Sequence, residues 1–371
     1  MRPAPCLTTV STMMARSFSE RRLTSPVTPS AVTPLTPADA IRSTTRLRLS
    51  TSTSPPFLNG VGSERHVVVA QQVRAGALDH GERLLQRLRA LGDIGSTGDG
   101  GCSRLALTDD DKHGRDLVLS WMRDLDLDVS IDAIGNVVGT WNTGSGAPVM
   151  TGSHIDTVRT GGLYDGNYGV LAGLEVIETC KELGVTPSRP MSVAFFTNEE
   201  GARFAPDMLG SLVYVGGLAL EEALDTPSID GKRLGDELQR IGYAGPRPCP
   251  AASAPSAFLE LHIEQGPVLE DEDIVIGVVT GVQGISWTEV VITGQSAHAG
   301  TTPMRLRHDP GLVAAAITTG VRDIAIRMGG TQVATVGRCE FSPNLVNVVP
   351  STVTMTVDLR NTDEAELRRA E

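Results

Sequence analysis

Imidazoles and carboxylates stand at the ends of apolar runs in this sequence, and this placement constrains the fold more than any other feature. They comprise His154 and Asp156 after the run at 148–151, Asp165 before a helical pattern, Glu199 and Glu200 after the run at 191–196, and His262 inside the run at 258–263. Burying a charged group without a partner costs several kcal/mol. In an α/β sheet, ligands gather outside the carboxyl ends of the strands. The pattern therefore predicts a sheet whose strand ends share one binding site.

Segments typical of strands and helices alternate between residues 77 and 275. Apolar residues recur at helical spacing at 78–91 and 168–183, and Thr108 followed by three aspartates predicts the start of another helix, running to about Leu125. Apolar runs suited to strands occupy residues 136–141, 148–151, 191–196 and 258–263. This alternation predicts an α/β fold, with a layered catalytic domain around a central sheet over residues 77–275.

The pattern changes after about residue 274. Strands are predicted at 276–282, 286–293, 331–338 and 352–359, and a long helix at 309–328. These elements predict a compact α+β domain over residues 276–371, inserted after the strand that carries His262. A further helix begins near Asp363, and the sequence ends at Glu371 before any return to the first sheet. We therefore expect that the C-terminal part of the catalytic domain is missing from this sequence.

Residues 1–76 differ in composition from the rest, most clearly in the first sixty. Residues 1–60 contain seven arginines, no lysine and only two acidic residues, and they are rich in serine, threonine and proline. Because no periodic apolar face is present, the segment is interpreted as a disordered tail or a targeting segment. Transit peptides are also rich in arginine and serine and poor in acids. The expected location is therefore the cytoplasm or the mitochondrion.

The overall composition excludes several classes of function. The net charge of −12 argues against a nucleic acid as partner, because a phosphate-binding surface needs a basic excess. The five cysteines are scattered and form no CxxC pair, which argues against a disulfide framework or a thiolate zinc site. No apolar run approaches the ~20 residues that cross a bilayer, so no membrane is expected as a partner.

The candidate ligands indicate a metal site of two ions. Mixed imidazole and carboxylate ligands suit zinc, manganese or cobalt rather than calcium. Asp165 is the candidate to bridge the ions, and Asp156 is placed to accept a hydrogen bond from the ring of His154. Glu199 and Glu200 are adjacent and would point in opposite directions in an extended chain, so they must have different roles. One would face the metal, and the other would act as general base.

Longer motifs resemble those of the M20 metallopeptidase family over residues 77–371. They are GSHIDTVRTGGLYDGNYGV, TNEEGARF, ELHIEQGPVLE, GQSAHAGTTPM, PNLVNVVP and VDLR. The segments HIEQGPVLE and AHAGTTPM are similar to those of the branch that hydrolyses ureido groups, which includes N-carbamoyl-L-amino-acid hydrolase, β-ureidopropionase and allantoate deiminase. The inserted domain would then be a lid and dimerisation domain.

The resemblance implies a role for each matching residue. His154 and His262 would bind one ion, Glu200 the second, with Asp165 as bridge; Glu199 would be the general base, His298 would stabilise the oxyanion, and Gln265, His298, Asn347 and Arg360 would contact the substrate. The family's fifth ligand is a histidine from a later glycine-rich segment, and no residue of this sequence matches it. We therefore expect the 371-residue chain itself to be poorly active.

The function implied is a binuclear-metal amidohydrolase that cleaves the ureido C–N bond of N-carbamoyl-L-amino acids or allantoate and releases ammonia. Its cofactors would be two divalent ions, zinc or manganese, with cobalt as a further candidate. Its partners would be a small ureido substrate and a second copy of the chain. Two alternatives stay open: an M20 aminoacylase or peptidase, and a non-catalytic dimerising member of the family.

Overall fold

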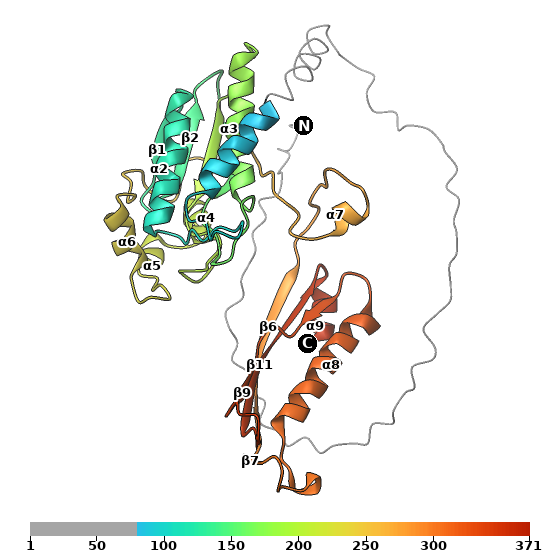
Figure 1. Ribbon diagram of the computed structural model, residues 1–371. Coiled ribbons are helices and arrows are strands. Elements are labelled where there is room, and N and C mark those ends of the chain that lie inside the picture. The colour runs from blue at the N-terminus through green and yellow to red at the C-terminus, as the bar shows by residue number, and fades with distance from the viewer. Residues whose placement is uncertain (1–79) are drawn as a thin grey trace, which may run out of the picture. The chain divides into compact units, whose positions relative to one another are not determined.

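The computed structural model describes residues 80–371, so the predictions for residues 1–76 lie outside the described residues. The described chain divides into two compact units, residues 80–276 and residues 277–371 (Figure 1). We call them the first and the second unit and describe each by itself. None of the helices in residues 80–371 is long and apolar enough to cross a membrane.

The first unit is built on a five-stranded mixed sheet with the order β1-β2-β4-β3-β5. Its strands are β1 (Asp128–Ile131), β2 (Val137–Trp141), β3 (Val149–His154), β4 (Met191–Phe196) and β5 (Ala257–Leu259). The pairs β1/β2 and β2/β4 are antiparallel, whereas β3 is parallel to both β4 and β5. The combination of helices with a mixed sheet agrees with the predicted α/β class.

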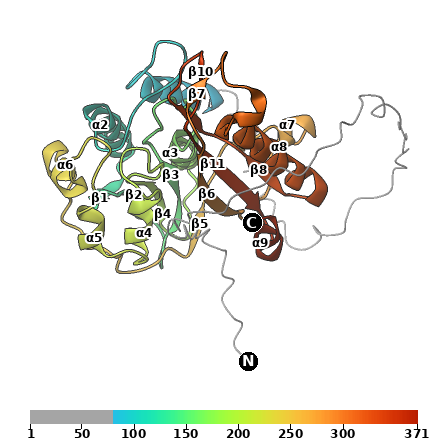
Figure 2. The ribbon, with the colours of Figure 1, turned by 90° about the horizontal axis from the view of Figure 1, so that it is seen from below.

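Helices cover the sheet and complete the core of the first unit. They are the helix at 80–92 together with α2 (Asp109–Asp124), α3 (Asn167–Glu182), α4 (Leu209–Tyr214), α5 (Leu220–Leu224) and α6 (Leu234–Ile241). The short helix α7 (Val268–Asp271) has no buried residue and is not part of this core. Helix α3 packs on β3 and β4 (Figure 2). Residues 192–195 of β4 are all buried, which requires cover on both faces of the sheet.

The helix predicted after Thr108 is confirmed. The Thr108 side chain accepts a hydrogen bond from the backbone N–H of Asp111, and three aspartates occupy the first turn of α2. The hydroxyl satisfies a backbone donor that the helix leaves free, and the carboxylates interact favourably with the positive end of the helix dipole. The helix predicted at 168–183 is likewise confirmed as α3, one residue earlier at both ends.

Two predicted strands of the first unit have wrong boundaries. Strand β3 is longer than predicted and includes His154 as its last residue. Strand β5 ends at Leu259, so His262 lies in an irregular segment and not within a strand. Strand β5 pairs with β3 only at residues 149–151. Beyond this pairing, the Ser153 hydroxyl donates a hydrogen bond to the Glu260 carboxylate. Strand β1 and helices α4 to α7 were not predicted.

The second unit is a sheet with helices packed on one face. Its elements are β6 (Gly284–Thr293), β7 (Ala297–His298), the short 3-10 helix η1 (Met304–Leu306), α8 (Pro310–Met328), β8 (Val333–Thr335), β9 (Cys339–Ser342), β10 (Val348–Val349), β11 (Thr352–Asn361) and α9 (Glu364–Ala370). Strand β11 is central and pairs antiparallel with β6, β8 and β9, while β7 pairs with β10. The long helix and the strands at 286–293 and 352–359 agree with the prediction.

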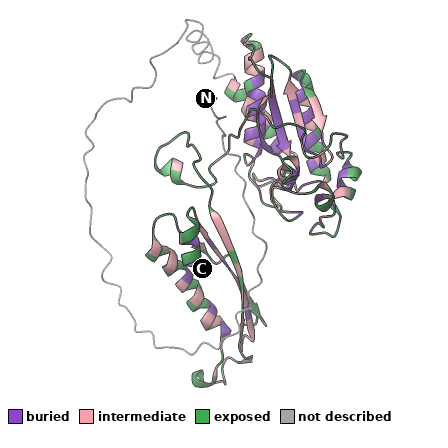
Figure 3. Cartoon of the chain, turned by 180° about the vertical axis from the view of Figure 1, so that it is seen from behind, coloured by how far each residue is buried: buried purple, intermediate pink, exposed green. Residues whose placement is uncertain are grey.

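Alternation along β11 explains how the second unit buries its core. Val353, Met355, Val357 and Leu359 are buried and pack with residues of α8 and α9, whereas the side chains between them face the other side of the sheet. That other face is more open, with Trp287 of β6 59 % exposed. Figure 3 shows the contrast with β3 and β4 of the first unit, in which most residues are buried.

The strand predicted at 276–282 is wrong. Residues 276–283 have no regular structure, and Val275 and Val278 are 94 % and 84 % exposed. An apolar run forms a strand only when a neighbouring strand accepts its backbone hydrogen bonds, and none of the described residues pairs with this run. The segment instead leads from the first unit to β6.

Candidate metal centre

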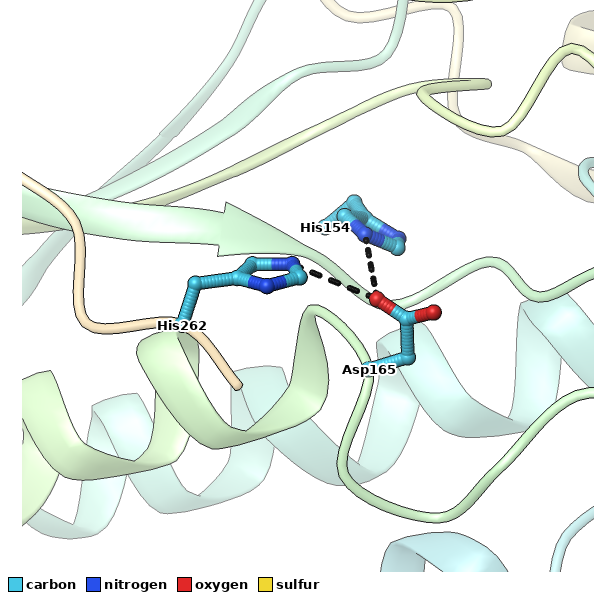
Figure 4. Close-up of side chains that lie close together, drawn as sticks. All are labelled: His154, Asp165 and His262. Atoms are coloured by element: carbon cyan, nitrogen blue, oxygen red, sulfur yellow. Dashed lines mark ion pairs between the residues drawn. The ribbon is translucent and has the colours of Figure 1, made fainter. Parts of the chain in front are cut away.

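Three residues from separate segments of the first unit lie close together. His154 is the last residue of β3, Asp165 lies in the loop before α3, and His262 follows β5. The Asp165 Oδ1 atom is 3.7 Å from His154 Nε2 and 3.2 Å from His262 Nε2 (Figure 4). Because β3 and β5 are parallel, their carboxyl ends lie at the same edge of the sheet, and this arrangement brings the two imidazoles together.

Hydrogen bonds to the main chain fix which nitrogen of each ring faces Asp165. The Nδ1–H of His154 donates to the carbonyl of Asp156, and the Nδ1–H of His262 donates to the carbonyl of Ile263, both over 2.8 Å. Each Nε2 is therefore the nitrogen that faces the shared carboxylate, and once it loses its proton its lone pair is free to bind an ion. Histidines that bind metals commonly use the second ring nitrogen in this way.

The spacing of the three ligand atoms fits a divalent ion. They all lie within 4.8 Å of one another. Ligands about 2.0–2.1 Å from a tetrahedral zinc ion are roughly 3.3 Å apart, close to the separations of 3.2 and 3.7 Å seen at Asp165. Two neutral imidazoles and a carboxylate are also a common ligand set for zinc. We conclude that His154, Asp165 and His262 can hold a metal ion.

Gly166 allows the ring of His154 to lie against the backbone of the loop that carries Asp165. A Cβ atom at this position would be 2.5 Å from three atoms of the imidazole, and the backbone φ is +65°. Only glycine satisfies both conditions without displacement or strain. The backbone at Gly166 therefore approaches the imidazole of His154 more closely than any other residue type would allow.

Asp156 supports the site differently from the prediction. Its Oδ1 atom is 4.0 Å from His154 Nδ1, and the ring donates instead to the backbone carbonyl of Asp156. The buried carboxylate accepts the backbone N–H groups of Glu199 and Glu200 at 3.2 and 3.3 Å. The predicted hydrogen bond from ring to carboxylate is wrong, because two backbone donors occupy the carboxylate. Asp156 thus joins the end of β3 to the turn after β4.

Glu199 and Glu200 lie in that turn. The prediction that they point in opposite directions assumed an extended chain, and this assumption is wrong. Residues 197–200 form a turn with Asn198 at a φ of 54°. The Oε2 atom of Glu199 is 3.4 Å from His154 Nε2. Glu200, predicted as a metal ligand, does not belong to the group of close ligand atoms found among residues 80–371.

The acidic groups of the site shift one another's pKa values. Hydrogen bonds from the two histidines hold the pKa of Asp165 well below its usual range. Burial and the neighbouring carboxylates raise the pKa of Glu200 to about 7, although the charge of His154 opposes this. Burial also raises the pKa of Glu199 against the same opposing charge. Such a concentration of carboxylates around two imidazoles favours the binding of a cation.

Gln265 contacts the carboxylate that was predicted to bridge two ions. Its side-chain amide donates to Asp165 Oδ2 over 2.5 Å, while Asp165 Oδ1 faces the two histidines. The residue was predicted to contact the substrate. In this structure it occupies the Asp165 oxygen that a bridging role requires, so binding a second ion there needs a movement of the Gln265 side chain.

The remaining predicted site residues belong to the second unit. His298 is exposed at the end of β7, and its Nδ1 accepts the backbone N–H groups of Gly300 and Thr301 at 3.0 and 3.3 Å. The carbonyl of Asn347 accepts the N–H of Ala299, so Asn347 lies beside the same loop. Arg360 of β11 donates to the Asp358 carboxylate from Nε and Nη2.

Polar residues that support the turn at 197–200 were not predicted. Arg115 of α2 is buried and donates to the Thr197 hydroxyl over 3.2 Å, and the amide oxygen of Asn136 accepts the Thr197 N–H over 2.9 Å. The sequence contained a signal for this role, because Arg115 is a charged residue on the apolar face of an amphipathic helix. Such a residue is rarely buried without partners, so hydrogen bonds from Arg115 to neighbouring segments could have been predicted. The sequence shows Arg115 at that position, six residues after the helix start.

Replacing Gly166 tests the close approach to His154. We expect Gly166→Ala to weaken binding of Zn²⁺ by roughly tenfold to a hundredfold, the usual effect of disturbing groups that orient a ligand. Isothermal titration calorimetry on the metal-free protein measures the affinity. Gly162→Ala is the matched control, because a Cβ there meets nothing within 4 Å. Equal affinities of the two variants would contradict the steric argument.

Metal affinity should rise with pH. Burial tends to lower the pKa of His154, but the hydrogen bond with Asp165 and the charges of Asp156 and Glu199 raise it to about 10. Below that pH the metal-free ring is protonated, so a binding ion must displace a proton. We expect the affinity for Zn²⁺ to increase about tenfold per pH unit between about pH 6 and 9 from this group alone. Calorimetry in two buffers of different ionisation enthalpy counts the released protons, and a pH-independent affinity would refute the argument.

Comparison with known proteins agrees with the site. The model of peptidase family M20/M25/M40 matches residues 150–364. An N-carbamoyl-L-amino-acid amidohydrolase of Rhizobium meliloti is 44 % identical over 288 residues, which are 77 % of this chain and 69 % of that protein. A ureidoglycolate hydrolase of Arabidopsis thaliana is 38 % identical over 274 residues, 71 % of this chain and 58 % of the relative.

A solved structure shares both sequence and fold with this chain. The crystal structure of an amidase of the hydantoinase/carbamoylase family from Burkholderia multivorans superposes with a TM-score of 0.73 at 47 % identity, covering 78 % of this chain and 71 % of that one. These relatives are hydrolases of carbon–nitrogen bonds by name, and the predicted family is confirmed. The chain belongs to peptidase family M20/M25/M40, and its named relatives there are amidohydrolases.

Proposed function

We propose that this protein is a metal-dependent amidohydrolase that cleaves the ureido C–N bond of N-carbamoyl-L-amino acids and releases ammonia. The observation that carries the proposal is the meeting of His154, Asp165 and His262, with the Glu199 carboxylate beside them. Further support comes from relatives named N-carbamoyl-L-amino-acid amidohydrolase, which are 44 % and 43 % identical to this chain.

The reaction needs both activation of the carbonyl and transfer of a proton. The ureido carbon is a poor electrophile because two nitrogens donate electrons to it, and a divalent ion supplies Lewis-acid activation when bound. Glu199 is placed for the proton transfers: its carboxylate lies 3.4 Å from His154 Nε2, and burial raises its pKa toward neutrality. In our proposal it takes a proton from the attacking water and delivers it to the leaving nitrogen.

A second ion is part of the proposal. Asp165 would bridge the two ions after Gln265 releases its Oδ2 atom, and Glu200 would bind the second ion. A dication beside Glu200 would lower the pKa of that carboxyl from about 7, so that it binds in its ionised form. We propose zinc or manganese, with cobalt as a further candidate, because these ions accept mixed nitrogen and oxygen ligands.

The second unit would serve as the lid and dimerisation domain and would contribute residues that bind the substrate. Because the Nδ1 atom of His298 accepts two backbone N–H groups, its hydrogen is on Nε2, which makes the ring a donor suited to a developing oxyanion. Arg360 would bind the substrate carboxylate with its planar guanidinium, in place of Asp358. Asn347 would add a polar contact. The partner would be a second copy of the chain.

Ureidoglycolate is the second candidate substrate. A relative at 38 % identity is named ureidoglycolate hydrolase, and the same ureido chemistry extends to allantoate. All three substrates carry a carboxylate and a terminal ureido group. The choice among them depends on the residues that surround the rest of the substrate.

Ammonia release from a panel of substrates tests the proposed function. We expect release from N-carbamoyl-L-alanine in the presence of Zn²⁺ or Mn²⁺, less from allantoate or ureidoglycolate, and no hydrolysis of N-acetyl-L-alanine or of a dipeptide. The assay uses the 371-residue chain and the product of the transcript sequenced past the codon for Glu371. Metal binding without ammonia release from any ureido substrate by either product would refute the proposal.

The role of Glu199 is tested by Glu199→Gln, which keeps the size of the side chain and removes the base. We expect kcat to fall by roughly 10²–10⁴-fold, as is usual for loss of a general acid–base group. Metal affinity should change little, because His154, Asp165 and His262 are retained. Glu222→Gln is the control, the same substitution at an exposed glutamate of α5. A loss of kcat in Glu199→Gln no larger than in the control would exclude Glu199 as the base.

A further inference from the structure

We propose that Arg104 is a positioning residue that sets the separation between His154 and Asp165. The inference rests on the proposed metal site and adds a residue outside the motifs of that site. Arg104 lies in the irregular segment between the helix at 80–92 and α2, and it is completely buried. It contacts neither candidate ligand directly, but it contacts the chain next to both.

The guanidinium of Arg104 joins the two segments that carry these ligands. Its Nε–H donates to the carbonyl of Ile155, the residue after His154, over 2.8 Å. Its Nη2 donates over 2.9 Å to the side-chain oxygen of Asn167, the first residue of α3 and the second after Asp165. A single rigid, planar group therefore spans the end of β3 and the start of α3.

The other nitrogen of the guanidinium anchors this connection to the helix at 80–92. Its Nη1 donates to the carbonyls of Leu91 and Ile94 over 2.7 and 2.8 Å. Four of the five N–H groups of an arginine side chain are thus used on oxygens from three segments. The main chain of Arg104 adds two bonds to Thr157, through its N–H to the hydroxyl and its carbonyl to the N–H of that residue.

The nature of these partners makes the arrangement rigid. None of the hydrogen-bond acceptors of the Arg104 side chain in the described part of the chain is a carboxylate, so the buried charge depends on four neutral oxygens and the Cys102 sulfur held in place. Hydrogen bonds to a charged donor are roughly twice as strong as neutral ones. A shift of either segment would leave a buried charge without its acceptors, which is costly.

Gly114 provides independent support, because it makes room for the Arg104 side chain. It lies in the interior of α2, where glycine weakens a helix relative to alanine. A Cβ atom at this position would be 2.9 Å from Cδ and 3.2 Å from Nε of Arg104. The glycine is therefore explained by the space that the arginine needs.

Metal titration and hydrogen exchange test this proposal. Metal-free wild type, Arg104→Met and Leu234→Ala are titrated with Co²⁺, whose visible absorption reports coordination geometry. Leu234 is a buried core residue of α6, so its truncation destabilises the unit without touching the segments at His154 or Asp165. We expect at least about tenfold weaker binding and an altered spectrum in Arg104→Met, whereas Leu234→Ala keeps wild-type affinity and spectrum.

Hydrogen exchange of the metal-free proteins gives a readout that does not depend on the metal. We expect faster exchange in residues 154–167 of Arg104→Met, and no selective increase there in Leu234→Ala. If Arg104→Met does not fold, Asn167→Ala is measured instead, because it removes the Arg104 acceptor at the start of α3, together with the donor to the Leu163 carbonyl. Arg104→Lys keeps the charge but not the planar set of donors, and we expect it not to restore the affinity.

The outcomes separate this inference from the proposed function. The positioning role would be overturned if a folded Arg104→Met kept the wild-type affinity and spectrum. If Arg104→Met does not fold, the same result in Asn167→Ala would overturn it. Exchange that rises uniformly in that variant would overturn it too. If the wild type itself binds no Co²⁺, the proposed function fails, and the exchange data alone decide: selective loosening of residues 154–167 supports the role of Arg104, and its absence refutes it.

Discussion

The parallel pairing of β3 with β4 and β5 is the constraint on which the site depends. It places the carboxyl ends of three strands at one edge of the sheet, so that His154, the turn with Glu199 and the segment with His262 converge. The connection from β3 to β4 starts with the loop that carries Asp165 and continues through α3 back to the start of β4, so Asp165 lies at the same edge of the sheet. Residues more than a hundred positions apart in sequence thereby become neighbours, and the ladder hydrogen bonds fix their spacing.

Around this edge, buried polar groups hold irregular segments in place. Asp156 binds the backbone of the turn at Glu199, Arg115 binds Thr197, and Arg104 binds the chain beside His154. Irregular backbone cannot satisfy its own hydrogen-bonding groups, so side chains must do so where water is excluded. The charged residues of the first unit therefore have two roles: some lie in the site, and others shape the loops that present it.

Elements defined by local patterns could be predicted from the sequence. The cap at Thr108 and the apolar periodicity of α3 are encoded within a few residues, and the family motifs include the three residues that the structure brings together, His154, Asp165 and His262. The end of β5 before His262 could not be predicted, because it depends on how far β3 extends beside it. The hydrogen-bond partners of Asp156 and Gln265 could not be predicted either. Several donors and acceptors lie within reach of each side chain, and only the packed structure decides among them. The apolar run at 276–282 likewise did not form the predicted strand, because the described chain offers it no partner strand.

The contact between Gly166 and His154 has a consequence for the entropy of ligand binding. The imidazole is confined between the backbone of the loop and its hydrogen bond to the Asp156 carbonyl, and it is 2 % exposed. Most of the rotamer freedom of this side chain is thus lost when the protein folds, before any ion arrives. Association then loses little additional conformational freedom at this ligand, in contrast to the more exposed His262. The two histidines differ in preorganisation, and His154 is the fixed reference point of the site.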